Sequence, residues 1–182
     1  MKHLVTLSLV ILFSHSLIYG QELDGKAFPV METETVDDEV IVLPGDVGDK
    51  YSLLGLAYSK KAEKDLNTWF SPVYHKFIKE ATGVFASFAY DINVYFVPMF
   101  TGVNAVATGK VKKKTAEELD PKLIPNILFY KGNLKDYKDA LNLDNRKVPY
   151  IFIVDTDGNI VYATSGEYTE DKMSAIEEAL DE

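Results

Sequence analysis

The feature that most constrains the fold is a nearly continuous apolar run, YSLLGLAY at Tyr51–Tyr58, followed directly by a helical pattern. Such a run predicts a central strand covered on both faces. Ser59 stands where a helix N-cap is expected, and Pro72 inside the pattern predicts a kink just before it. The apolar face of this helix consists of Ala62, Leu66, Trp69, Val73 and Phe77.

The rest of the chain continues the alternation of strands and helices. Tandem β–α–β units predict parallel strands, and the turn sequence DTDGN at Asp155–Asn159 predicts a hairpin that adds antiparallel strands. We therefore expect an α/β fold with a central mixed β-sheet flanked by helices. The expected strands are Val40–Leu43, Ile92–Val97, Asn126–Lys131, Tyr150–Val154 and Ile160–Thr164, and the expected helices are 103–119, Leu134–Leu141 and Glu170–Leu180.

Charge and cysteine content exclude several classes of function. The net charge is −9, which argues against general nucleic-acid binding because that needs a basic footprint. The sequence has no cysteine, so it has no disulfide, no thiol nucleophile, no cysteine-ligated zinc and no iron–sulfur cluster. No cofactor, metal site or catalytic residue is predicted.

The N-terminal residues have the pattern of a secretory signal peptide. Lys2 supplies the positive charge, Leu4–Phe13 is apolar but shorter than the roughly 20 residues that span a bilayer, and Gly20 precedes Gln21 as the expected mature start. We expect a signal peptide over 1–20, a polar, flexible lead-in over 21–38 and one domain over 39–182. This organisation predicts an exported, periplasmic or extracellular protein with no transmembrane segment after cleavage.

Three segments together resemble the thioredoxin-like superfamily, in the branch of peroxiredoxins and periplasmic thiol–disulfide proteins. Phe28-Pro29 with Val40–Pro44 resembles its N-terminal lead-in, and Ser52–Ser59 with the following helix resembles its active-site strand and helix. Val148–Val161 resembles its cis-proline strand and hairpin. The resemblance covers roughly 28–182 and implies a thioredoxin-like three-layer sandwich in which Pro149 follows a cis peptide bond.

Two further resemblances are narrower. Trp69, Pro72 and the strand Ile92–Val97 are similar to the mitochondrial ATP synthase assembly-factor family, which has the same fold. The mature chain, beginning at Gln21, is also similar to exported Bacteroidetes-type thioredoxin-like proteins. The departure from the redox members is that Ser59–Lys64 (SKKAEK) occupies the place of their reactive cysteines, so the chain is expected to be redox-inactive.

The candidate site is the groove that this fold uses for partners. In thioredoxin-like proteins the residue before the cis-proline presents backbone groups to an extended partner segment, which is a form of β-augmentation. The helix N-terminus and its lysines favour an acidic peptide or a carboxylate terminus. We expect a protein or peptide partner to contact Ser59, Lys60, Lys61, Lys64, Val148, Pro149 and Tyr150.

Other interpretations stay open beside this one. An enzyme with a non-thiol mechanism could use the same groove, but Ser59 and His75 lie about 24 Å apart along one helix and cannot hydrogen-bond. The calcium-loop pattern beginning at Asp155 lacks the required glycine and glutamate. The basic run 110–114 is interpreted as a solvated helix end or as a docking patch for an anionic partner or lipid headgroup. An assembly factor could instead use the aromatic loop Gly83–Asp91.

Overall fold

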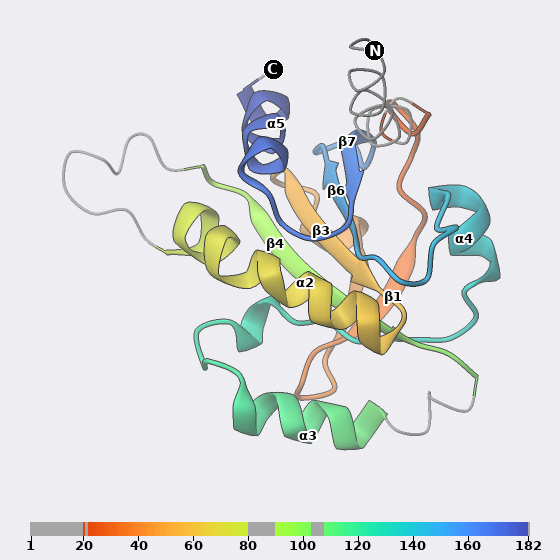
Figure 1. The fold of residues 1–182 in the computed structure, drawn as a ribbon. Helices are drawn as coiled ribbons and strands as arrows, with labels where there is room; N and C mark the ends of the chain where they lie inside the picture. Colours follow the sequence, from red (N-terminus) through yellow and green to blue (C-terminus); the bar gives the residue numbers. More distant parts are fainter. Residues whose placement is uncertain (1–19, 21, 80–89, 103–107, 182) are drawn as a thin grey trace, which may run out of the picture.

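A computed structural model describes residues 20, 22–79, 90–102 and 108–181 (Figure 1). The expected signal peptide and aromatic loop fall mainly on residues outside these ranges, as do residues 103–107 at the start of the second expected helix. Within the described part of the chain, no helix combines the length and apolar character needed to cross a bilayer. The strands are β1 (Met31–Glu34), β2 (Val40–Leu43), β3 (Ser52–Ala57), β4 (Asn93–Phe100), β5 (Tyr130–Lys131), β6 (Tyr150–Val154) and β7 (Ile160–Ser165).

The helices alternate with these strands as the sequence predicts. They are α2 (Lys60–Val73), α3 (Thr108–Glu118), α4 (Lys135–Leu141) and α5 (Glu170–Asp181), with short turns η1 (Gly45–Val47), η2 (Tyr74–Ile78) and η5 (Ile124–Asn126). The main sheet has the order β5-β4-β3-β6-β7. β3 is parallel to β4 and antiparallel to β6, so the sheet is mixed, and the expected fold class is confirmed.

The sheet separates two apolar layers because successive side chains of a strand point to opposite faces. All six residues of β3 are buried. Leu53 and Ala57 face the layer that contains the buried side chains of α2 and α5, whereas Leu54 and Leu56 face the layer of α4 and the N-terminal segment. Figure 1 shows α2 and α5 on one side of the sheet and α4 on the other, which gives the three-layer arrangement.

The N-terminal segment packs more closely than the expected flexible lead-in. Leu23, Phe28 and Met31 are buried, and Ala27 bridges to Asn159. Strand β1 pairs along its length with β2 and bridges through Glu34 to Phe129, next to the edge of the main sheet. The compact unit therefore includes residues before 39, because these scattered apolar side chains complete the core on the α4 side.

The predicted hairpin after β6 is confirmed. β6 and β7 pair antiparallel, and the amide of Asp155 donates to the carbonyl of Asn159 at 2.9 Å. The Asp155 carboxylate accepts hydrogen bonds from the amides of Asp157 and Asn159. Its oxygens therefore hold the turn, and no cluster of candidate metal ligands occurs in the described residues.

The two helices α2 and α3 are attached to the domain by different means. α2 buries the predicted apolar face of Ala62, Leu66, Trp69 and Val73, and η2 continues it with Phe77. The buried residues of α3 are only Thr108 and Lys112. In α3, Lys113–Glu117 and Lys114–Glu118 form the exposed i,i+4 pairs of a solvated helix. Lys112, in the middle of the basic run 110–114, is instead buried.

Lys112 anchors α3 to the β1–β2 hairpin. Its ammonium binds the carboxylates of Glu34 at 2.7 Å and Asp38 at 2.6 Å, and it lies 5.7 Å from the ring centroid of Phe129. Burial lowers the pKa of Lys112, but the hydrogen bonds that its ammonium donates to these carboxylates, together with their negative charges, outweigh burial and leave the pKa raised. The paired charges compensate for taking the ammonium out of water.

Candidate functional site

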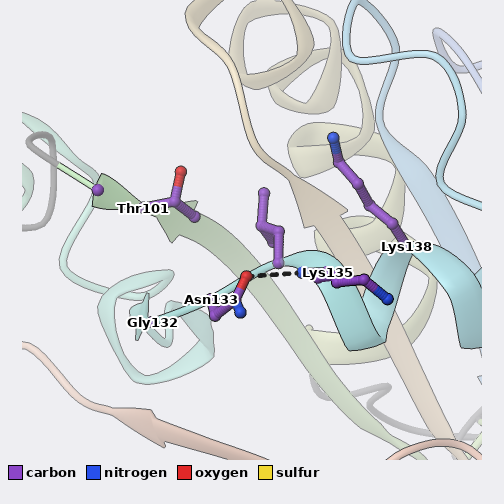
Figure 2. Close-up of a pocket in the computed structure, with 7 residues that line it drawn as sticks. Thr101, Gly132, Asn133, Lys135 and Lys138 are labelled. Atoms are coloured by element: carbon purple, nitrogen blue, oxygen red, sulfur yellow. Dashed lines mark hydrogen bonds between the residues drawn. The ribbon is translucent and has the colours of Figure 1, made fainter.

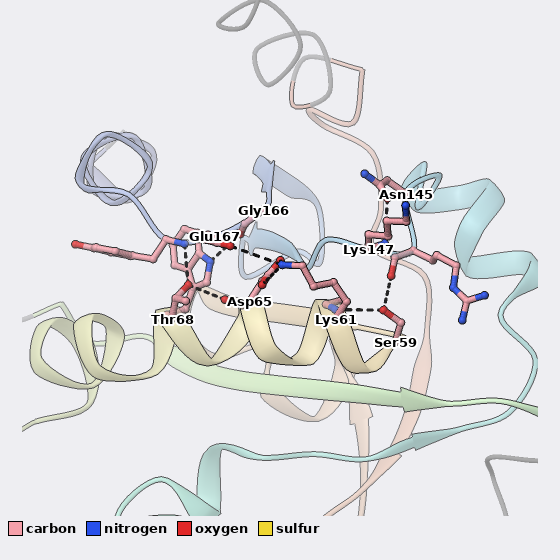
Figure 3. Close-up of polar contacts among 12 residues, drawn as sticks. Ser59, Lys61, Asp65, Thr68, Asn145, Lys147, Gly166 and Glu167 are labelled. Atoms are coloured by element: carbon pink, nitrogen blue, oxygen red, sulfur yellow. Dashed lines mark hydrogen bonds and ion pairs between the residues drawn. The ribbon is translucent and has the colours of Figure 1, made fainter.

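The candidate site lies where β3 ends and α2 begins, against the loop between α4 and β6 (Figure 3). Two hydroxyl groups join this loop to the end of β3. Tyr58 donates to the carbonyl of Leu143 at 2.5 Å, and Ser59 donates to the carbonyl of Arg146 at 2.5 Å. The structure thus brings together the two segments, Ser59–Lys64 and Val148–Tyr150, between which the sequence places a groove.

Ser59 is the N-cap of α2, as predicted. Its backbone is extended, and its hydroxyl accepts the amide of Ala62 at 3.2 Å while donating to Arg146. The single hydroxyl proton is therefore used in a hydrogen bond to a carbonyl, which is not a base that could activate a nucleophile. This geometry suits a structural link between the helix and the loop.

The three lysines of the first two turns of α2 are exposed but not equivalent. Lys61 binds the buried carboxylate of Asp65 at 2.5 Å and lies 3.7 Å from Glu167 (Figure 3). The hydrogen bond to Asp65 raises the pKa of Lys61. Among the described residues, Lys60 and Lys64 have no ion-pair partner, so these two side chains remain available to an anionic ligand.

Asp65 belongs to a polar network that the sequence does not reveal. Thr68 donates its hydroxyl to the backbone carbonyl of Asp65 and accepts the amide of Tyr168. The indole of Trp69 donates to the carbonyl of Gly166 at 3.0 Å. Figure 3 shows this network along one side of α2, where it fixes the loop between β7 and α5 against the helix.

Tyr150 lies beneath the surface. It is 3% exposed, and its hydroxyl accepts the amide of Asn145 at 2.7 Å and donates to the Asn145 carbonyl. Its ring stacks on that of Tyr58 at 6.5 Å, and burial raises the pKa of Tyr58 to about 12. Tyr150 therefore shapes the loop from inside, while the loop residues themselves form the surface.

The expected cis bond before Pro149 is wrong. Among the described residues the cis peptide bond is Leu43–Pro44, and Val148–Pro149 is trans. The trans form is the lower-energy state of an X–Pro bond by about 0.5–1 kcal/mol. Here the Val148 amide donates to the Asn145 carbonyl and closes a turn, and the chain continues through the trans bond into β6.

The backbone around this proline is already engaged within the chain. The Val148 amide contacts the Asn145 carbonyl at 3.4 Å, and the Pro149 carbonyl accepts the amide of Gly166 at 2.9 Å. Pro149 is buried and Val148 is half-buried. The Val148 amide and the Pro149 carbonyl are therefore not free to hydrogen-bond a partner segment in the way that the sequence predicts for this position.

Two exposed cations, Arg146 and Lys147, were missed by the sequence reasoning. They lie on the loop that the Ser59 hydroxyl binds, next to the start of α2. The signal was present as the dipeptide directly before Val148-Pro149. Asp144 is an exposed acidic residue on the same loop. Lys60, Lys64, Arg146 and Lys147 are exposed near this helix end and form no ion pair with another residue of the described ranges.

A neighbouring depression of about 730 Å³ continues the same edge of the sheet (Figure 2). It lies beyond the ends of β4 and β5, between Thr101, Asn133 and Lys138. The Lys138 ammonium lies 5.1 Å from the ring centroid of Tyr58, which connects this depression to the site. Lys135 also lines it but is paired with Asp139 at 2.8 Å, and Figure 2 shows its side chain pointing away.

The comparison with family models decides the classification. Residues 13–182 match the model described as ATP10 protein. The chain belongs to the ATP10 protein family. This match confirms the resemblance to the assembly-factor family that Trp69, Pro72 and the strand at 92–97 indicate. The search of curated proteins returned no match.

Solved structures place this ATP10-family chain in the thioredoxin-like fold. The reduced 2-Cys peroxiredoxin of Plasmodium vivax is 13% identical, with 87% of this chain and 96% of that chain covered and a TM-score of 0.53. The pneumococcal exposed lipoprotein thioredoxin of Streptococcus pneumoniae is 16% identical, with 82% and 99% covered and a TM-score of 0.53.

A third neighbour is BsSco, described as a member of the Sco family of cytochrome c oxidase assembly proteins. It is 12% identical, with 88% of this chain and 98% of that chain covered and a TM-score of 0.53. At these identities the likeness concerns the fold alone. The thioredoxin-like resemblance is thereby confirmed in a chain that has no cysteine.

Proposed function

We propose that this ATP10-family chain is an exported, redox-inactive binding or assembly protein. The observation that carries the proposal is the Ser59 hydroxyl, which caps α2 and links it to the Arg146 carbonyl at the place where redox relatives hold thiols. Without a sulfur nucleophile the helix end retains only its shape and its charge. The assembly-factor family fits a function that depends on binding.

The charge of the site indicates the chemistry of the partner. Lys60 and Lys64 near the start of α2, and Arg146 and Lys147 on the loop that Ser59 binds, are exposed cations on a chain with a net charge of −9. An acidic segment is attracted to these cations and repelled by the remainder of the protein, which directs it to one place. Because the Val148 amide and the Pro149 carbonyl are engaged internally, side-chain cations rather than backbone groups carry the recognition.

The binding test compares two charge-reversed variants of the mature chain. In the first, Lys60, Lys64, Arg146 and Lys147 are all replaced by Glu. The matched control replaces four exposed lysines elsewhere by Glu, namely Lys26, Lys79, Lys113 and Lys122. The probes are a fluorescein-labelled Glu-rich nonapeptide and its Gln counterpart, measured by fluorescence anisotropy.

We expect the wild type to prefer the Glu peptide and to lose affinity as salt rises, because salt screens exposed charges. The site variant should bind the Glu peptide at least tenfold more weakly than the control variant, with both folded by circular dichroism. Equal binding of the Glu peptide by the two variants would show that these four cations are not the binding site. Intact mass of the exported protein tests the localisation, with Gln21 expected as the first residue.

A further inference from the structure

A groove with an apolar floor separates α2 from α3 on the face opposite α4. Val111, Thr115 and Leu119 recur at a spacing of four residues along α3 and its end, and all three are half-buried. Leu66 and Phe70 of α2 form the facing wall. The cavity between them measures about 640 Å³, and Figure 1 shows α2 and α3 as neighbouring helices with no other helix drawn between them.

The apolar residues of α3 pack only in part against the core, since Val111 and Leu119 contact the layer of α2 but stay half-buried. The buried anchor of α3 is Lys112, which points to Glu34 and Asp38 and away from the groove lining. Amphipathic helices usually bury their apolar stripe against the domain. Here Val111 and Leu119 pack against the α2 layer but stay half-buried, so part of the apolar stripe faces the groove.

The charge expected of the occupant follows from Glu63. Glu63, in the first turn of α2, lines the groove and is half-buried, and burial raises its pKa. It forms no hydrogen bond or ion pair with a described residue, and Lys60 acts on it only at longer range. A basic group brought into the groove would compensate the lost hydration of this carboxylate.

We propose that this groove binds an amphipathic helix of a partner protein, with aliphatic side chains toward the floor and a Lys or Arg paired with Glu63. Two helical walls accept a third helix by packing its side chains between theirs. The stripe from Val111 to Leu119 spans roughly 12 Å, about two helical turns of the partner. Lys60, Glu63, Lys114 and Glu118 all line the groove, and Lys114 pairs with Glu118, so Glu63 is the lining carboxylate that forms no ion pair with a described residue.

This inference does not rest on the acidic partner of the proposed function. The Glu-rich nonapeptide tests the cations at the start of α2 and on the 144–148 loop, whereas Glu63 selects the opposite charge in the groove. Failure at one surface therefore leaves the other intact. The groove test avoids Lys60 because this residue borders both surfaces.

The probes are synthetic 18-residue helical peptides with leucines at i, i+3, i+4 and i+7. One series carries a single Lys at successive positions flanking the leucines, and the matched series carries Gln there. Titration of the ¹⁵N-labelled chain should shift the amides of Leu66, Phe70, Val111 and Leu119 and leave Lys147 unshifted. Shifts confined to other surfaces would overturn the proposal.

Two variants with controls then test the floor and the charge. Val111→Asp places a charge on the floor and should weaken binding at least tenfold, whereas Lys113→Asp on the exposed side of α3 should leave it unchanged. The best Lys peptide should bind about fivefold tighter than its Gln counterpart, and Glu63→Gln should abolish this preference. Equal binding by Val111→Asp and wild type, or tighter binding of dodecanoate than of every peptide, would refute a helix-binding groove.

Discussion

Helices α2 and α3 lie on the same side of the sheet but are held there by different forces. α2 buries a continuous apolar face that includes Trp69. α3 buries the ammonium of Lys112 between two carboxylates and leaves its apolar residues Val111 and Leu119 only half-buried against the core. Apolar burial is non-directional and tolerant of small shifts, while an ion pair depends on particular partners. The difference teaches that α2 belongs to the core and that α3 is an attachment to it.

The largest effect should follow from removing the apolar anchor of α2. Trp69 is fully buried, packs edge-to-face on Tyr168 at 5.4 Å and donates to the Gly166 carbonyl. Trp69→Ala should lower the free energy of unfolding by about 3–5 kcal/mol, since it leaves a cavity. Urea denaturation followed by circular dichroism measures this loss.

A smaller loss for Trp69→Phe than for Trp69→Ala is expected, because phenylalanine refills part of the cavity. If Trp69→Ala cost less than 1 kcal/mol, α2 would not be the core helix that its burial indicates.

Removing the ion pair between Lys112 and its two carboxylates should destabilise α3 but not α2. Lys112→Met keeps the aliphatic packing of the side chain but removes the charge-assisted hydrogen bonds to Glu34 and Asp38. We expect the opening free energy of α3 amides to fall by about 2 kcal/mol, with α2 amides unchanged. Hydrogen exchange followed by NMR separates the two helices.

Lys113→Met is the matched control for this change, because Lys113 is the exposed neighbour in the same helix. A uniform loss of protection in α2 and α3 after Lys112→Met would show that the two helices open as one unit, contrary to the comparison.

Acid should release α3 before α2. The hydrogen bond from Lys112 lowers the pKa of Glu34 and also that of Asp38, from ordinary values of 4.5 and 3.8. Because the folded-state pKa values of the two carboxylates are lowered, their ion pairs with Lys112 stabilise the fold at pH values above the ordinary pKa values. This stabilisation is lost as the pH falls through the lowered pKa values. Exchange protection of α3 should therefore decline below about pH 4, and Lys112→Met should lack this step. A pH-independent α3 in the wild type would contradict the assignment.

The same contrast explains what could be predicted from the sequence. Strands β3 and β6 and helix α2 are visible because each carries its own apolar pattern, with Tyr51–Tyr58 as the clearest case. Strand β1 is not visible, since METE is polar at alternate positions and becomes a strand only through its pairing with β2. Lys112 lies within a basic run that reads as solvated, and its partners are 78 and 74 residues away.

The candidate site shows the same limit. The role of Ser59 as a cap is local and was predicted, whereas the contribution of Arg146 depends on a loop 87 residues away. Tyr150 is expected to contact a partner, but the structure buries it through stacking on Tyr58 and hydrogen bonds to Asn145. The expected cis bond before Pro149 came from a resemblance, and the turn that precedes β6 here accommodates a trans bond.

The smallest expected effect concerns the N-cap of α2. Ser59→Ala removes the acceptor for the Ala62 amide and should cost about 1 kcal/mol of unfolding free energy, well below the loss from Trp69→Ala. Because the same change deletes the donor to the Arg146 carbonyl, protection of the loop amides 145–148 should fall together with that of the first turn of α2. Ser59→Thr keeps both hydrogen-bonding functions and should restore both signals. If Ser59→Ala exposed the helix turn but left the loop protected, Tyr58 and Tyr150 would hold the loop without help from the cap.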